Sequence, residues 1–169
     1  MYETLTRSAD VVSVGAVSSV APDVEKLLDF LPVLYPGGSA WLARAAAEVE
    51  GGRADAFAAV VGDTTVGVGF GALKPSNRYK IRTLFVSPAD RGRGIGRMLL
   101  VALTDRAKEL GAYEIYVTAA TTIRDDFEPM IGKAGFNIIA TESSRYGCGR
   151  DEDIFVKQLH LLSDRTSLT

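Results

Sequence analysis

A glycine-rich turn stands between a short apolar segment and a long amphipathic one, and it constrains the fold more than any other feature of this chain. The apolar segment is residues 81–86, and the turn is Arg91-Gly92-Arg93-Gly94-Ile95-Gly96. Three glycines within five residues let the backbone approach a ligand without interference from Cβ atoms. The helix expected to follow directs its first free N–H groups and the positive end of its dipole at the turn. The sequence therefore predicts a strand, a phosphate-binding turn and a helix, in that order.

The residues around the glycines narrow the class of phosphate site. Arg91 and Arg93 carry fork-shaped donors that suit a pyrophosphate better than a single carboxylate. A nucleotide-hydrolysing P-loop needs Lys followed by Ser or Thr after its last glycine, whereas Gly96 is followed by Arg97 and Met98. A dinucleotide-binding turn needs G-x-G-x-x-G, and this turn has the spacing G-x-G-x-G. Both classes are therefore disfavoured.

The run from Val86 to Gly96, Val-Ser-Pro-Ala-Asp-Arg-Gly-Arg-Gly-Ile-Gly, resembles the acetyl-CoA-binding signature of the GNAT family of N-acetyltransferases. The resemblance is strong over residues 84–110, and Gly135-Phe136 is similar to the pair that follows the family's last helix. It implies acetyl-CoA as co-substrate, with its pantetheine arm contacted by Leu84, Phe85 and Val86. The phosphate contacts that it implies are Arg91, Gly92, Arg93, Gly94, Ile95, Gly96 and Arg97.

Length predicts a single domain over residues 1–169, with short flexible tails at about 1–8 and 163–169, and the resemblance implies that it is an N-acetyltransferase domain. A chain of 169 residues can bury roughly two-thirds of its unfolded surface. Cys148 is the only cysteine, which excludes an internal disulfide and favours a reducing compartment. Neither a membrane-spanning run nor a signal-peptide pattern is present, so a cytoplasmic protein without a membrane partner is expected.

The order of apolar runs and turn residues predicts an α/β fold without repeats. The family resemblance implies a mixed, mostly antiparallel sheet of six or seven strands flanked by about four helices. The expected strands are residues 11–17, 56–62, 65–73, 80–87, 113–118, 136–141 and 153–160. The expected helices begin at Pro22 with Val24, Leu27, Leu28 and Leu31 on one face, at Ser39 as N-cap, at Gly94 with an end at Gly111, and at Asp125 with an end before Gly135.

Strands 80–87 and 113–118 are expected to be parallel neighbours, because the helix between them makes a right-handed crossover. A parallel pair that splays apart at its carboxyl ends leaves a cleft for the pantetheine arm beside the phosphate turn. There, the resemblance implies, a thioester meets an amine. A backbone N–H near Phe85 or Val86 is expected to stabilise the developing oxyanion.

Two positions depart from the family's pattern. Members often carry a tyrosine four residues before the glycine of the Gly-Phe pair, where it protonates the leaving thiolate, and this chain has Ile131 there. Many also carry a glutamate near the position of Arg82. Arg82 is therefore expected to bind an anionic group of the acceptor or to neutralise an acid on a neighbouring strand.

Tyr146 is the residue expected to act as general acid. It lies in a glycine-bearing loop between the last two expected strands, and loops on a rigid sheet commonly supply function. Other candidates remain open, namely Tyr116 and Cys148 as acids, and Glu114 and Glu142 as bases. His160 is the only histidine and has no Cys or His cluster around it in sequence, so no metal site is expected.

The leading functional hypothesis is an acetyl-CoA-dependent N-acetyltransferase that acts on a primary amine of a small molecule or peptide. Residues 64–89 hold four basic and no acidic residues, which keeps an acyltransferase on RNA or an acidic protein as an alternative. Nucleic acid is disfavoured because the whole chain is mildly acidic. A CoA-binding sensor that has lost catalysis is the other alternative. The sequence specifies neither the acceptor, nor the acyl chain, nor whether the protein is a homodimer.

Overall fold

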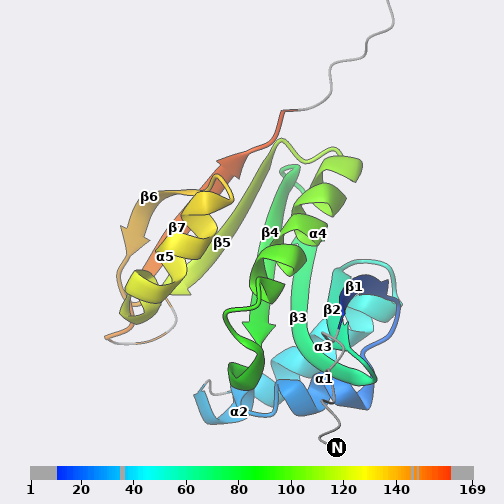
Figure 1. Ribbon diagram of the computed structural model, residues 1–169. Coiled ribbons are helices and arrows are strands. Elements are labelled where there is room, and N and C mark those ends of the chain that lie inside the picture. Colours follow the sequence, from blue (N-terminus) through cyan, green and yellow to red (C-terminus); the bar gives the residue numbers. More distant parts are fainter. Residues whose placement is uncertain (1–10, 35–36, 146, 148, 161–169) are drawn as a thin grey trace, which may run out of the picture.

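A single sheet with helices on both faces organises the computed structural model, which describes residues 11–34, 37–145, 147 and 149–160. Seven strands lie in the order β1-β2-β3-β4-β5-β7-β6. Figure 1 shows α4 and α5 on one face and α1, α2 and α3 on the other. The strands are β1 (Val12–Val17), β2 (Asp55–Val61), β3 (Thr64–Leu73), β4 (Arg78–Val86), β5 (Glu114–Ala120), β6 (Asn137–Glu142) and β7 (Glu152–Gln158). The helices are α1 (Pro22–Leu27), α2 (Leu31–Leu34), α3 (Gly38–Glu50), α4 (Ile95–Glu109) and α5 (Arg124–Lys133).

The predicted α/β class and mixed sheet are confirmed. The pair β4–β5 is parallel, and every other pair in this sheet is antiparallel. Strand boundaries agree with the sequence-based ones within two residues. No helix in the described ranges is long and apolar enough to cross a bilayer.

Two expectations for the N-terminal helices were wrong. The helix that begins at Pro22 ends at Leu27, and Leu31 starts the separate helix α2 instead of extending the first. Pro32 explains the break, because proline has no N–H to continue an α-helical ladder. Ser39 does not cap α3. Gly37, in the left-handed conformation at φ 83°, takes the N-cap position, and Ser39 lies in the first turn.

Alternate glycines along β3 bring α4 close to the sheet. A Cβ atom added at Gly69 would lie 2.9 Å from Cδ1 of Leu103, and one at Gly71 would overlap the ring of Tyr79. The phenol of Tyr79 reaches across β3 and donates a hydrogen bond of 2.9 Å to Asp55 on β2. Asp55 also accepts a hydrogen bond from Arg106 of α4. The other face of β3 carries Val68, Phe70 and Ala72 against α1 and α3.

An ion pair with one buried partner fastens α5 to the far half of the sheet. Asp153 of β7 is fully buried and accepts two hydrogen bonds, of 2.6 and 2.5 Å, from the guanidinium of Arg124. Thr141 of β6 donates a third, at 2.7 Å. The hydrogen bond from Arg124 lowers the pKa of Asp153, and burial opposes that shift only in part. One carboxylate thereby ties together β6, β7 and the start of α5.

The parallel pair β4–β5 separates halfway along its length, as Figure 1 shows. Pairing runs from Arg78 opposite Glu114 to Ile81 opposite Val117, and β4 continues to Val86 without a partner on that side. On its other side β4 carries a bulge. Phe70 and Gly71 of β3 lie opposite Thr83 and Ile81, so Arg82 is an extra residue in the ladder. A bulge bends the strand that carries it, which accounts for the turn of β4 away from β5 at this point.

Candidate active site

The free edge of β4 forms the floor of the candidate site. The N–H of Ser87 donates to the carbonyl oxygen of Val66 on β3, at 2.8 Å. Because backbone groups alternate between neighbours along a strand, the N–H of Phe85 also points to β3, whereas those of Leu84 and Val86 point to the β5 side. Of the two residues expected to provide an oxyanion donor, Val86 is thus the one with its N–H toward the gap.

Side chains along this segment alternate between the two faces. The ring of Phe85 packs against the ring of Phe30 in the α1–α2 connection, with the two ring centroids 4.6 Å apart. Leu84 and Val86 pack on the α4 side, in a cluster with Ile95 and Leu99. The three side chains are therefore committed largely to packing, and the backbone of residues 84–86 is what this segment can offer a ligand.

The glycine-rich turn has the open backbone that the sequence predicts. A short 3₁₀ helix, η1 (Pro88–Asp90), leads into it. Gly92 and Gly94 have φ values of 80° and 77°, a region that side-chain-bearing residues rarely adopt. A Cβ atom built on either glycine would meet no atom within 4 Å. The space over both residues is open to a ligand.

Helix α4 begins in this turn without a capping side chain. Gly94 is the N-cap residue, and neither a side-chain hydrogen bond nor an acidic residue stands at the first turn. The first helical hydrogen bond runs from the N–H of Met98 to the carbonyl of Gly94, at 3.1 Å. The N–H groups of Ile95, Gly96 and Arg97 therefore precede the ladder and are available to an anion. The side chain of Ile95 is buried, so only its backbone can serve this role.

Three arginines surround the open turn. Arg91 lies with its guanidinium 5.6 Å from the ring centroid of Phe85 and donates through Nε to the carbonyl of Val86, at 3.1 Å. Arg93 pairs with Asp90 at 2.9 Å. Arg97 is exposed in the first turn of α4. The turn combines positive side chains with free N–H groups, which is the donor set that a pyrophosphate requires.

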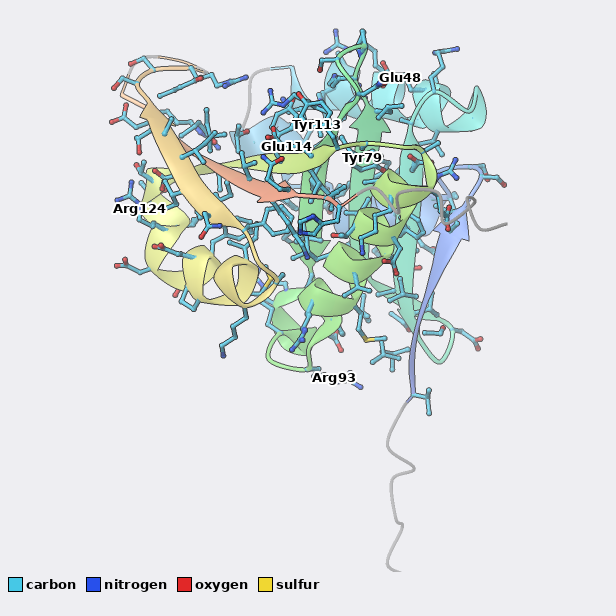
Figure 2. The ribbon with its side chains drawn as sticks, turned by 90° about the horizontal axis from the view of Figure 1, so that it is seen from above. Glu48, Tyr79, Arg93, Tyr113, Glu114 and Arg124 are labelled. Carbon is cyan, nitrogen blue, oxygen red and sulfur yellow. The ribbon has the colours of Figure 1, made fainter. Side chains whose placement is uncertain are left out.

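A small cavity opens on the opposite face of the sheet, next to the point where β4 leaves β5. Its volume is about 180 Å³, and it is lined by Trp41, Arg44, Ala45, Glu48 and Arg82. Arg82 forms an ion pair with Glu48 of α3. Figure 2 shows Glu48 and Arg93 on opposite sides of the sheet. The expectation that Arg82 neutralises an acid on a neighbouring strand was wrong in one respect, because the acid belongs to a helix.

The remaining catalytic candidates fall in different places. Tyr146 and Cys148 lie outside the described residues. Ile131 belongs to α5, and its side chain is fully buried in the core. Glu114 stands at the closed end of the β4–β5 pair, where Arg78 and Gln158 bind its carboxylate at 2.5 and 2.6 Å. Figure 2 shows Glu114 beside Tyr113.

Each of the two further candidates contacts an arginine. Glu142, in the exposed edge strand β6, pairs with Arg145 at 2.5 Å. Tyr116 lies under the guanidinium of Arg78, 4.3 Å from the ring centroid. Sequence reasoning missed Trp41, Arg44 and Glu48. Nothing local marked them, since Glu48 and Arg82 are 34 residues apart in the chain.

A splayed parallel pair next to an uncapped glycine turn can hold an extended ligand that ends in a phosphate group. Comparison with known proteins identifies the family. The family model described as the acetyltransferase (GNAT) family matches residues 24–136, more than half of the chain. The chain therefore belongs to the acetyltransferase (GNAT) family, as its turn motif predicted. No protein of curated function matches it in sequence.

Solved structures share the fold at low sequence identity. An IAA acetyltransferase from Bacillus cereus is 19% identical with a TM-score of 0.71, over 88% of this chain and 100% of the other. A Bacillus subtilis acetyltransferase in complex with CoA is 17% identical with a TM-score of 0.72, over 89% and 100%. The ribosomal-protein-S18-alanine N-acetyltransferase from Escherichia coli is 13% identical with a TM-score of 0.72, over 94% and 100%.

Proposed function

We propose that this protein is an acetyl-CoA-dependent N-acetyltransferase that acetylates a primary amine of a small molecule or peptide. One observation carries the proposal: the unpaired edge of β4 leads through η1 and the glycine-rich turn into the uncapped start of α4. A pantetheine arm on the backbone of residues 84–86 and a pyrophosphate on residues 92–97 would then occupy one continuous groove. The CoA complex of the Bacillus subtilis structure supports this choice of ligand.

The chemistry divides between the co-substrate and the chain. Acetyl-CoA supplies an acetyl group activated as a thioester. The lone pair of a neutral amine forms the new C–N bond, the C–S bond breaks, and its electron pair leaves with the sulfur. The Val86 N–H would donate to the oxyanion that develops on the carbonyl. Because a primary amine has a pKa of about 10, its extra proton must leave before attack.

Tyr146 is proposed as the acid that returns a proton to the departing sulfur. The buried Ile131 offers no donor at the position where many family members carry a tyrosine. Tyr146→Phe is expected to lower kcat while the affinity for acetyl-CoA stays unchanged, because it removes a hydroxyl and little volume. An unchanged kcat would remove this role from Tyr146.

Two measurements on the full chain test the proposed function. Calorimetric titration with CoA should give one binding event per chain, and thiol release from acetyl-CoA should accelerate with at least one member of a broad amine panel. Absence of binding would refute the groove assignment. The second candidate, a CoA-binding sensor, is favoured by the missing phenol at Ile131, and it predicts binding without thiol release for every amine.

A further inference from the structure

The cavity between α3 and β4 contains more positive than negative charge. Two of its lining residues, Arg44 and Arg82, are cations, and Glu48 is the one acid among them. Arg82 already pairs with Glu48. Arg44 is exposed and has neither a hydrogen bond nor an ion pair within the described ranges. The Arg82–Glu48 pair compensates one of the two positive charges, which leaves the guanidinium of Arg44 for an entering ligand.

Charges beyond the lining residues add to this excess. The pKa of Glu48 is lowered, first by the hydrogen bond from Arg82, against the opposing effect of burial, and then by the charges of Arg82, Arg53 and Lys74. These cations come from β4, from the α3–β2 connection and from the β3–β4 connection. Glu48 is thus ionised at neutral pH and lies in a positive environment.

The position of the cavity assigns it to the acceptor side of the groove. Arg82 is the first residue of β4 beyond the last pair with β5. The phosphate turn lies with α4 on one face, whereas the cavity lies under α3 on the other, and Figure 2 shows Arg93 and Glu48 apart in this way. An acceptor that enters beside α3 would meet β4 where a thioester bound from the α4 side ends.

We propose, on the basis of the proposed function, that the acceptor amine carries a carboxylate close to the amino group, and that Arg44 and Arg82 bind this carboxylate. A guanidinium carries five N–H donors, so Arg82 can hold Glu48 and a second carboxylate together. Trp41, packed edge-on against Phe70 at 6.1 Å, gives the cavity an apolar wall for the body of the acceptor. A polycationic acceptor fits less well, because the negative charge of Glu48 is already compensated by its ion pair with Arg82.

Matched acceptors test this inference. Glycine, leucine and phenylalanine are each compared with their own amides at saturating acetyl-CoA, by thiol release. At least one acid should exceed its amide about tenfold in kcat/KM, the ratio expected for one charge-assisted contact. The amino group of an amide is less basic than that of the acid, so more of it is neutral at a given pH. This difference favours the amide, so a higher kcat/KM for the acid does not come from amine basicity. Arg44→Gln should bring the ratio close to one, and Lys133→Gln, an exposed change on α5, should leave it unchanged.

Direct binding covers the case in which these acids turn over slowly. Each N-acetylated acid and its amide is titrated into the protein saturated with CoA. Binding of an acid that is lost in Arg44→Gln supports the inference. Equal or better use of the amides, or the absence of carboxylate-dependent binding in this series, overturns it. Those results do not contradict the proposed acetyltransferase function. That function is refuted only if CoA does not bind or no amine of the broad panel releases thiol.

Discussion

Ile81 of β4 lies opposite Val117 of β5, and it is the last residue of β4 that has a partner on β5. The next residue, Arg82, is also unmatched on the β3 side. The parallel pairing therefore ends at the place in the strand where the bulge occurs. From there to Val86, one edge of β4 is free for a ligand, and the side chain of Arg82 reaches Glu48 on the other face.

We predict that Gly94→Val abolishes CoA binding. Gly94 has φ 77°, so valine adds backbone strain of about 1–2 kcal/mol, and its branched side chain fills the space where a phosphate would lie. Gly111→Val is the matched control, because Gly111 has φ 76° and equally open surroundings at the other end of α4. Both variants should lose similar stability in thermal unfolding, but only Gly94→Val should lose CoA affinity in calorimetry. Equal affinities in the two variants would refute the phosphate-turn assignment.

Arg97→Gln is predicted to weaken CoA binding about tenfold. Its exposed guanidinium stands in the first turn of α4. A charge-assisted hydrogen bond contributes roughly 1.5–3 kcal/mol, and the lower end of this range applies to an exposed group. The measurement is calorimetry at two salt concentrations. The variant should show a shallower salt dependence than the natural chain, whereas Lys133→Gln should not change it. A variant with unaltered affinity would place the phosphates away from Arg97.

Gly71→Ala is predicted to destabilise the fold by about 1–3 kcal/mol, the usual cost of overpacking. The added methyl group would overlap the ring of Tyr79, which is fully buried and is held by its hydrogen bond to Asp55. Gly15→Ala provides the contrast, since no atom lies within 4 Å of the added carbon in β1 and the backbone there is extended. Chemical denaturation should show a loss for Gly71→Ala and no loss for Gly15→Ala. Equal stability of the two would contradict the close packing of Tyr79 over β3.

The buried carboxylate of Asp153 should make stability depend on acid. Its pKa in the folded chain is lowered, so the unfolded chain binds the proton more tightly. Its stabilising contribution is complete above the unfolded-state pKa of about 4 and is lost as the pH falls through the lower folded-state value. Denaturation midpoints between about pH 6 and pH 2.5 should fall more steeply for the natural chain than for Asp153→Asn. Parallel curves would contradict this account.

The sequence was sufficient for those parts of the fold that depend on local chemistry. Alternating apolar residues and turn-forming glycines identified all seven strands, and the crossover rule placed β4 beside β5. The open glycine turn was equally predictable, because its glycines and the helix start are consecutive, and phosphate binding by this turn stays a prediction. Ser39 was misassigned because glycine and serine can both begin a helix, and here Gly37 takes the N-cap position in the left-handed conformation.

The proposed acceptor side could not be predicted from the chain, because it is assembled from distant segments. Glu48 and Arg82 belong to a helix and a strand that meet only through the packing of α3 on the sheet. The bulge could not be predicted from the sequence either, because one unmatched residue leaves the apolar pattern of residues 81–86 nearly unchanged. The role of Gly71 depends on Tyr79 of the next strand, a relationship that exists only once the register is fixed.

The unmatched residue in β4 sets a rule for how this segment can evolve. Because Arg82 is the extra residue, its deletion would restore a regular ladder in which Thr83 still lies opposite Phe70, and the side chains beyond it would keep their faces. A residue inserted between Thr83 and Phe85 would instead turn Phe85 toward α4 and exchange which amides face the gap. Residue types along this stretch can therefore drift during descent, and a deletion at the bulge can be absorbed, whereas insertions beyond it should be purged.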